Sequence, residues 1–306
     1  MNDTMKISKK ADFTGHTGSV YALSPALNTS NFLSAGGDRI IAEWEPGNPE
    51  NGSVVARTTE IIYSLLKLPQ QELLLAGQAT GGIHVVNLNS RKEERLLQYH
   101  KSPVFDLAHA PKSNLIFSLG GDGTLGVINE HDLSLKRIIQ IGDGKLRVAA
   151  IHPQEQMVAI GVADGSIAIF SLPDLKLIHL WQAHQPGFSV NALTFSRDGN
   201  QLFSGSRDAH LQVYDVTSNY ELTQKIPAHN YAIYSIVLHP TENIFATGSR
   251  DKTIKIWDGT TFEIIKRIDK ISDSGHVNSV NKLLFLADGL LLSASDDRSV
   301  MAWEFR

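Results

Sequence analysis

The stretch that decides the fold is IFATGSRDKTIKIWD, residues 244–258, in which two apolar segments flank a polar turn. Such a pattern is typical of two β-strands joined by a turn. An aspartate in the turn precedes a tryptophan by six residues, and three pairs in the chain share this spacing: Asp38 and Trp44, Asp251 and Trp257, Asp297 and Trp303. The recurrence indicates an internal repeat.

The repeat extends through the whole chain when other residues are allowed at the two positions. The aspartate position is filled by Asp38, Thr80, Asp122, Asp164, Asp208, Asp251 and Asp297. The apolar position, six residues later, is filled by Trp44, Val86, Ile128, Phe170, Tyr214, Trp257 and Trp303. Successive apolar positions differ by 42, 42, 42, 44, 43 and 46 residues, so seven units of one design fill the chain. A fixed period in this range indicates a solenoid or a propeller.

Two further positions recur in five of the seven units. A hydroxyl residue stands four positions before the aspartate: Ser34, Ser118, Ser204, Thr247 and Ser293. A histidine stands 21 to 24 positions before it: His16, His100, His184, His229 and His276. The second unit has Thr58, Ala76, Thr80 and Val86 at these positions, and the fourth has Gly142, Ile160, Asp164 and Phe170. These two units depart from the shared design.

With these positions in view, the units resemble WD40 repeats, residues 229–258 above all, and the resemblance covers essentially the full chain. It implies an all-β fold in which each unit supplies four antiparallel strands and seven blades close into a ring around a channel. A propeller grows by adding units, so the length does not call for two domains. We expect residues 1–306 to form a single seven-bladed WD40 β-propeller domain.

The end of the chain indicates how the ring closes. Three residues follow Trp303, so the last unit lacks the outer strand that follows the tryptophan position elsewhere. Near the start, Ile7, Ala11 and Phe13 alternate with polar residues. We expect residues 5–13 to form the outer strand of the last blade, as in the family, because the ring would otherwise keep two unpaired edges.

The WD40 resemblance also implies that the four recurring residues form a hydrogen-bonded chain across a blade, in which each buried polar group has a partner. Three units have the full set, a structural tetrad: His16, Ser34, Asp38, Trp44; His229, Thr247, Asp251, Trp257; His276, Ser293, Asp297, Trp303. We expect the second and fourth blades to be held by packing instead, and to be the least rigid.

The recurring Ser, His and Asp residues also occur in hydrolase triads. However, an enzyme needs one triad with an exposed serine, whereas five matched copies inside strands indicate a repeated fold element. The histidines show no pairing with a glutamate on a helix, so we expect no metal site and no cofactor.

Composition excludes several classes of protein. The net charge of −4, from 28 basic and 32 acidic residues, provides no overall attraction to nucleic acid or anionic membranes, so a nucleic-acid role would need a local basic patch. The chain has no cysteine, which excludes disulfides and thiol catalysis. No apolar run is long enough to span a membrane, and residues 1–6 are too polar to begin a secretory signal. We expect a cytoplasmic protein without a membrane partner.

Function is expected where the units differ, because the shared residues hold the blades. The WD40 resemblance places two kinds of variable position on the top face: residues of the inner strand and the residue before the turn aspartate. The candidates for partner binding are Tyr21, Tyr63, Phe105, Lys145, Arg147, Arg207, Tyr234 and Arg250. Blades one to three offer an apolar arc and blades four to six a basic arc. Aromatic and arginine side chains dominate interface energetics.

Two interpretations of these residues stay open. They form a docking face for a protein or peptide with hydrophobic anchors and acidic or phosphorylated residues, or the aromatic side chains plug the channel and the arginines pair with local carboxylates. The leading hypothesis is a non-catalytic protein-interaction scaffold. The alternative is a propeller that binds a small ligand or works as an enzyme in its channel, but Asp296 is the only carboxylate among the mapped positions.

Overall fold

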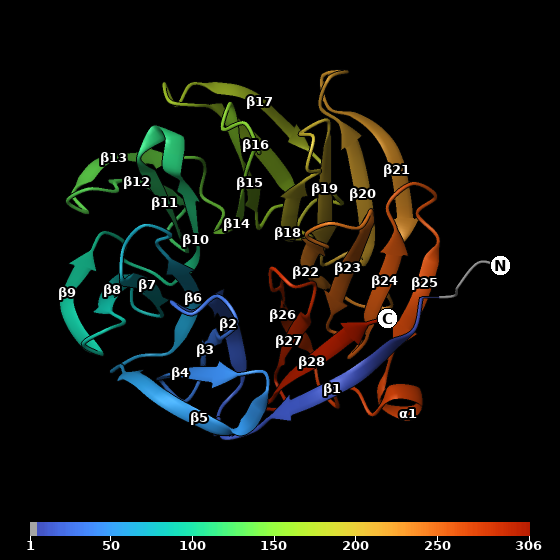
Figure 1. The fold of residues 1–306 in the computed structure, drawn as a ribbon. Coiled ribbons are helices and arrows are strands. Elements are labelled where there is room, and N and C mark those ends of the chain that lie inside the picture. Colours follow the sequence, from blue (N-terminus) through green and yellow to red (C-terminus); the bar gives the residue numbers. More distant parts are fainter. Residues whose placement is uncertain (1–4) are drawn as a thin grey trace.

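Seven four-stranded antiparallel sheets stand around a central channel in the computed structural model, which describes residues 5–306 (Figure 1). The strands nearest the channel are β2 (Val20–Pro25), β6 (Ile62–Lys67), β10 (Val104–Ala110), β14 (Leu146–Ile151), β18 (Val190–Phe195), β22 (Ile233–Leu238) and β26 (Val280–Phe285). The second strands are β3 (Phe32–Gly36), β7 (Leu73–Gln78), β11 (Leu115–Gly120), β15 (Met157–Val162), β19 (Gln201–Ser206), β23 (Ile244–Ser249) and β27 (Leu291–Ser295).

Two further rings of strands complete the blades. The third strands are β4 (Ile40–Glu45), β8 (Gly82–Asn87), β12 (Thr124–Asn129), β16 (Ser166–Ser171), β20 (His210–Asp215), β24 (Ile254–Asp258) and β28 (Val300–Phe305). The outer strands are β5 (Asn48–Arg57), β9 (Lys92–Gln98), β13 (Leu135–Gln140), β17 (Leu177–Gln182), β21 (Glu221–Pro227), β25 (Ile264–Ile268) and β1 (Ile7–Phe13). Short helical turns occur at Pro111–Ser113 and at α1 (Lys270–Asp273). The predicted fold class is confirmed. Of the predicted domain, residues 1–4 lie outside the described range.

The first strand of the chain closes the ring, as predicted. β1 pairs antiparallel with β28, from Ile7 opposite Phe305 to Phe13 opposite Val300, and it is the outer strand of the seventh blade. Phe13 is fully buried and also reaches the first blade, where its ring lies 4.9 Å from that of Phe32 and 5.8 Å from that of Trp44. β1 therefore joins the last blade to the first.

The hydrophobic core lies between the blades. Along β11, Phe117 packs in a cluster with the fourth blade, whereas the adjacent Ile116 packs in a cluster with the second. Successive side chains of a strand point to opposite faces of the sheet, so a strand buried on both faces is apolar without interruption. This explains why the second strands are mostly apolar and almost entirely buried. Among the described residues, no helix is long and apolar enough to cross a membrane.

Deleting residues 1–13 tests the closure. We expect the shortened chain to lose its cooperative thermal transition, because β28 would become an unpaired edge and the site of Phe13 between two blades would be empty. Circular dichroism melting and size-exclusion chromatography measure this. A variant that lacks only residues 1–4 keeps β1 and serves as the control. The closure would be contradicted by a chain without residues 1–13 that stays monomeric and melts at the parent temperature.

Candidate functional site

The sixth blade contains a continuous hydrogen-bonded chain of four side chains. His229 Nδ1 lies 2.9 Å from Asp251 Oδ2, and His229 Nε2 lies 2.8 Å from Thr247 Oγ1. Trp257 Nε1 donates to the same hydroxyl oxygen at 2.9 Å. The hydroxyl thus accepts from the indole and donates to the imidazole, which in turn donates to the carboxylate. No member of the chain has a free reactive group, so its role is structural.

The same bonds join the residues of the other two predicted tetrads. In the first blade the three distances are 2.7 Å each, between His16 and Asp38, His16 and Ser34, and Trp44 and Ser34. In the seventh blade they are 2.8 Å, 2.8 Å and 2.9 Å, between His276 and Asp297, His276 and Ser293, and Trp303 and Ser293. The serines are fully buried, unlike a hydrolase nucleophile.

Each tetrad aspartate also fixes backbone near the channel. Asp251 accepts hydrogen bonds from the backbone N–H of Asn230 and of Thr253, both at 3.0 Å. Burial raises the pKa of Asp251, but hydrogen bonds from His229, from the side chain of Thr253 and from the backbone N–H of Asn230 outweigh burial and hold the pKa well below its ordinary value. The carboxylate therefore ties the loop before β22 to the turn that carries Arg250.

The second blade has a polar network of its own, so the prediction that it is held by packing alone is wrong. Gln78 Oε1 lies 2.7 Å from Nε2 of His84, and Gln78 Nε2 donates to Thr80 Oγ1 at 3.0 Å. Both Gln78 and His84 are buried. One residue in the sequence could have indicated this network. His84 lies inside the apolar strand β8, at a position where the repeat has no histidine. In the fourth blade, the carboxylate of Asp164 accepts from the N–H and the hydroxyl of Ser166 in its own turn, and no other described residue donates to it.

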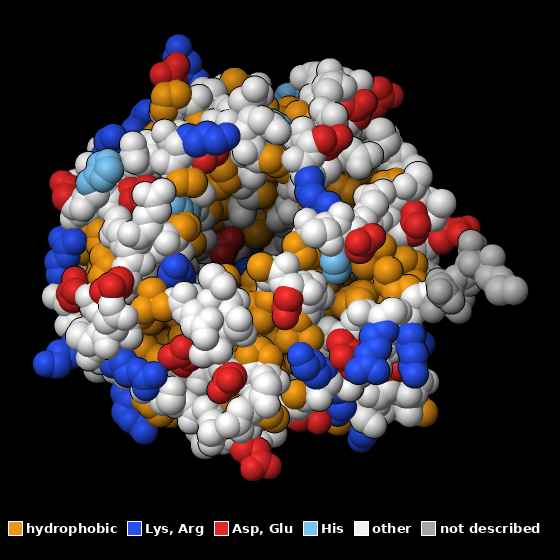
Figure 2. Space-filling model, viewed as in Figure 1, with side chains coloured by type: hydrophobic (Ala, Val, Ile, Leu, Met, Phe, Trp, Pro, Cys, Tyr) orange, Lys and Arg blue, Asp and Glu red, His pale blue; other side chains and the backbone are white. Residues whose placement is uncertain are grey.

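A β-bulge in every inner strand directs one side chain into the channel. The register of each inner strand skips one residue against its partner, and the skipped residues are Tyr21, Tyr63, Phe105, Arg147, Asn191, Tyr234 and Asn281. A bulge re-aims the side chain of its extra residue. All seven line one cavity of about 400 Å³, and the hollow at the centre of the ring is visible in Figure 2.

A second repeated contact brings the other variable positions beside the bulges. In every blade, the backbone N–H of the residue before the turn aspartate donates to the carbonyl of the residue two positions before the bulge. In the fourth, fifth and sixth blades these bonds join Ala163 to Lys145, Arg207 to Ser189, and Arg250 to Ala232, each at 2.9 Å. The variable positions identified in the sequence therefore lie side by side around the mouth of the channel.

Three of the bulge residues form an aromatic row along the channel wall: Tyr21, Tyr63 and Phe105. The ring centroids of Tyr21 and Tyr63 are 5.3 Å apart, and those of Tyr63 and Phe105 are 5.5 Å apart. The row ends where Arg147 Cζ lies 4.1 Å from the centroid of Phe105, a cation–π contact. Burial, together with the neighbouring Tyr21, raises the pKa of Tyr63, which keeps its hydroxyl protonated.

Both carboxylates that line this cavity already have partners. Asp106 Oδ1 lies 3.9 Å from Nζ of Lys282, and Oδ2 accepts from the backbone N–H of Ala149 at 3.0 Å. Asp296 Oδ1 accepts from Asn281 Nδ2 at 2.8 Å. The sequence mapping missed Asp106, which follows the bulge residue Phe105. Within residues 5–306, no group of three or more His, Cys, Asp or Glu side chains is arranged to hold a metal ion.

The basic residues of the fourth, fifth and sixth blades line a neighbouring cavity of about 440 Å³, and we call them the basic group: Lys145, Arg147, Arg207 and Arg250. No carboxylate lines this cavity, and no member of the basic group forms an ion pair with a described residue. The interpretation in which the arginines pair with local carboxylates therefore gains no support. Arg147, Asn191 and Tyr234 line both cavities and connect the basic group to the aromatic row.

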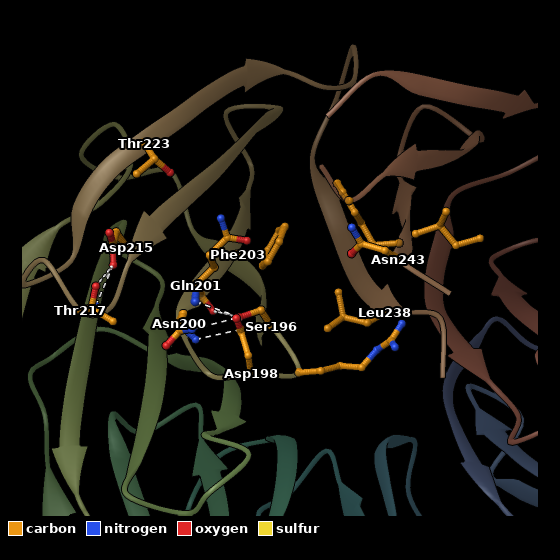
Figure 3. Close-up of a pocket in the computed structure, with 14 residues that line it drawn as sticks. Ser196, Asp198, Asn200, Gln201, Phe203, Asp215, Thr217, Thr223, Leu238 and Asn243 are labelled. Atoms are coloured by element: carbon orange, nitrogen blue, oxygen red, sulfur yellow. Dashed lines mark hydrogen bonds between the residues drawn. The ribbon is translucent and has the colours of Figure 1, made fainter. Parts of the chain in front are cut away.

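A third cavity, of about 560 Å³, lies between the fifth and sixth blades (Figure 3). Its polar groups are occupied within their own turns: Asp198 accepts from Ser196 and Asn200, and Asp215 accepts from Thr217. Arg197, which also lines the cavity, donates to the carbonyls of His239, Thr241 and Glu242 and so fastens the two blades together. These contacts are structural.

Comparisons with known proteins agree with this architecture. The family model of the WD domain, G-beta repeat, matches residues 7–45, and that of the nucleolar protein 10-like N-terminal domain matches residues 63–303. WD repeat-containing protein 37 of Mus musculus is 30% identical over 108 residues, which cover 35% of this chain and 21% of that protein. WD repeat-containing protein 55 of Danio rerio is 33% identical over 114 residues, which cover 36% of this chain and 29% of that protein.

A solved structure has the same fold. The WD40 beta propeller domain of Doa1 matches with a TM-score of 0.85 at 20% sequence identity, over 98% of this chain and 97% of that one. The matches to the two curated relatives span less than a third of the length of either protein.

Substitution of two turn aspartates tests the tetrads. We expect Asp251→Ala to lower the free energy of unfolding by about 1 to 3 kcal/mol, because it leaves a buried histidine and backbone N–H groups without an acceptor. Asp164→Ala should cost less, because the carboxylate of Asp164 accepts only from Ser166 in its own exposed turn. Urea denaturation of both variants measures the difference. An equal or larger loss for Asp164→Ala would contradict the assigned role of the tetrads.

The tetrads also predict a loss of stability in acid. Burial lowers the pKa of His100 and of His229 in the folded protein, so the unfolded chain binds protons more readily below the ordinary pKa of about 6.5. Stability is complete above that pH and falls as the pH drops below it. The lowered pKa of Asp251 and of Asp297 adds a further loss below about pH 4.

Urea denaturation at pH 7.5, 5.5 and 4.5 measures this dependence. His229→Asn should reduce the slope between pH 7.5 and 5.5, whereas His131→Gln, at an exposed histidine, should leave it unchanged. Equal stability of the parent at pH 7.5 and 5.5 would be incompatible with the proposed titration.

Proposed function

This chain belongs to the WD40-repeat β-propellers and, among them, to the family of the nucleolar protein 10-like N-terminal domain, and from this premise we propose that it is a non-catalytic protein-interaction scaffold. The observation that carries the proposal is the gathering of the variable positions around one end of the channel, where the aromatic row and the basic group adjoin. Aromatic and arginine side chains are the residues that most often dominate binding energy at protein interfaces.

We propose that the partner is a protein or peptide segment that docks on this top face. An apolar side chain of the partner would contact Tyr21, Tyr63 and Phe105, and acidic or phosphorylated residues would contact the basic group. The two surfaces meet at Arg147, so one short segment can contact both. The residues we assign to binding are Tyr21, Tyr63, Phe105, Lys145, Arg147, Arg207, Tyr234 and Arg250.

The rival function, an enzyme or small-ligand binder in the channel, has less support. General acid and base catalysis needs carboxylates or histidines that converge on a substrate position. Asp106 and Asp296 are each engaged by neighbouring side chains, and the tetrad histidines are buried away from the channel cavity. A purified chain that turns over a small molecule, with loss of turnover in Asp296→Asn, would support the rival function instead.

The compartment is part of the proposal. The sequence leads us to propose the cytoplasm, whereas the description of the matching family names a nucleolar protein and makes the nucleolus the alternative. Fluorescence microscopy of the tagged chain in its own cells, beside nucleolar and cytoplasmic markers, decides between them.

Affinity capture with mass spectrometry tests the scaffold. The parent and a variant with Arg147, Arg207 and Arg250 all changed to Gln are used as baits, with Lys136→Gln as a matched control for an exposed cation on the outer strand β13. We expect a partner that the parent and the control retain and the triple variant loses. A partner that binds all three baits equally would place docking on another surface.

Single substitutions separate the two parts of the face. We expect Arg250→Glu and Tyr63→Ala each to weaken binding of the recovered partner, measured by calorimetric titration. The exposed Arg250→Glu should leave the free energy of unfolding within about 0.5 kcal/mol of the parent. Its effect on binding should shrink as salt rises, because exposed charges are screened over about 8 to 10 Å at physiological ionic strength. The effect of Tyr63→Ala should persist in high salt. Binding that neither change affects would contradict the assigned face.

A further inference from the structure

The basic group concentrates positive charge that the folded chain does not neutralise. Its four cations come from three consecutive blades, and no carboxylate lines their cavity. Lys145, Arg207 and Arg250 are exposed, while Arg147 is half-buried against Phe105. Like charges that share one cavity repel each other, and an anion bound there would relieve that repulsion. This arrangement costs stability and is most simply explained by an anionic ligand.

We propose that the basic group binds the phosphate monoester of a phosphorylated serine or threonine in the partner, so that phosphorylation of the partner switches docking on. The inference rests on the proposed function of the top face and specifies how docking there is regulated. The phosphate would lie in the cavity of about 440 Å³ that the basic group lines. Ser189 and Asn191 also line this cavity, where Ser189 Oγ donates to Asn191 Oδ1 at 2.9 Å.

A phosphate fits the basic group better than a carboxylate does. A phosphate monoester carries a charge of about −1.5 to −2 near neutral pH and presents three acceptor oxygens, whereas a carboxylate carries one charge and two oxygens. Guanidinium groups donate in a planar fork that matches phosphate oxygens. Three arginines and a lysine around one cavity therefore match the larger charge and the greater number of acceptors.

The aromatic row predicts the neighbour of the phosphorylated residue. Arg147 lines both cavities and lies over Phe105, so the phosphate site is adjacent to the end of the row. A residue next to the phosphorylated one would lie against Phe105 and Tyr63. We therefore expect an apolar or aromatic residue adjacent to the phosphorylated position.

Nucleic acid is the less favoured source of phosphate. A nucleic acid presents a phosphate at every nucleotide, and proteins that bind it neutralise several of them along a groove. Here the cations line a single cavity, and the adjoining channel wall carries the carboxylates of Asp106 and Asp296. The net charge of the chain is −4. These features match one phosphate flanked by an apolar residue.

Three immobilised peptide libraries test the proposal, identical except for a fixed central phosphoserine, glutamate or serine. We expect the full chain to bind the phosphoserine library about tenfold or more tightly than the other two, as a few charge-assisted hydrogen bonds would produce. Apolar residues should be enriched beside the phosphoserine. Arg207→Gln and Arg147→Gln should remove the preference, and Lys136→Gln should keep it, with circular dichroism showing each variant folded.

Defined outcomes would overturn the proposal. Equal binding of the phosphoserine and serine libraries excludes phosphate recognition, and equal binding of the phosphoserine and glutamate libraries reduces the site to one for acidic residues. Tighter binding of a random 20-nucleotide RNA, lost in Arg207→Gln, would assign the site to nucleic acid. If a partner captured by affinity is lost with Tyr63→Ala but keeps binding after phosphatase treatment, the scaffold function stands and the phosphate inference fails.

Discussion

A four-stranded blade cannot cover either of its own faces, and the rest of this structure depends on that constraint. The apolar side chains of a middle strand such as β11 are divided between two clusters, one shared with each neighbouring blade. No blade is therefore complete until both neighbours are in place. The ring satisfies the requirement for all seven blades at once, and the pairing of β1 with β28 provides the last contact. Phe13, buried against Phe32 and Trp44 of the first blade, makes that closure hydrophobic as well as hydrogen-bonded.

Within this ring, structural and variable residues occupy different positions. The tetrads fix the turns and the loops that lead into the inner strands. Asp251 does so by accepting from the N–H groups of Asn230 and Thr253. The bulges then present one side chain per blade to the channel and interrupt the pairing of the inner strand only at that residue. The channel residues can therefore vary from blade to blade at little cost to the fold. The aromatic row and the basic group result from this freedom.

The sequence was sufficient for the fold because a spacing repeated seven times survives the loss of individual residues. It also located β1. The last repeat lacks an outer strand, and the alternation at Ile7, Ala11 and Phe13 predicts a strand that can take this place. It did not reveal the network of Gln78 and His84, because these residues stand outside the repeat register and their contact depends on how the chain folds in one blade. The approach of Lys282 to Asp106 joins the seventh and third blades across the channel, so only the closed ring makes it visible. The lack of ion pairs around the basic group likewise depends on three-dimensional distances.

The position of β1 has a consequence for synthesis of the chain on the ribosome. Ser8 lies opposite Glu304 in the finished sheet, and 296 positions separate the two residues in sequence. The first strand of the propeller must therefore leave the ribosome well before the last strand with which it pairs, and the contacts between them close a very long loop. During this interval β1 is an unpaired strand and the first blade has one bare face, both of which can associate with other chains. The unpaired β1 and the uncovered face of the first blade thus stay exposed for most of the synthesis of the propeller. A chaperone that covers them would protect the chain when it is most prone to aggregate.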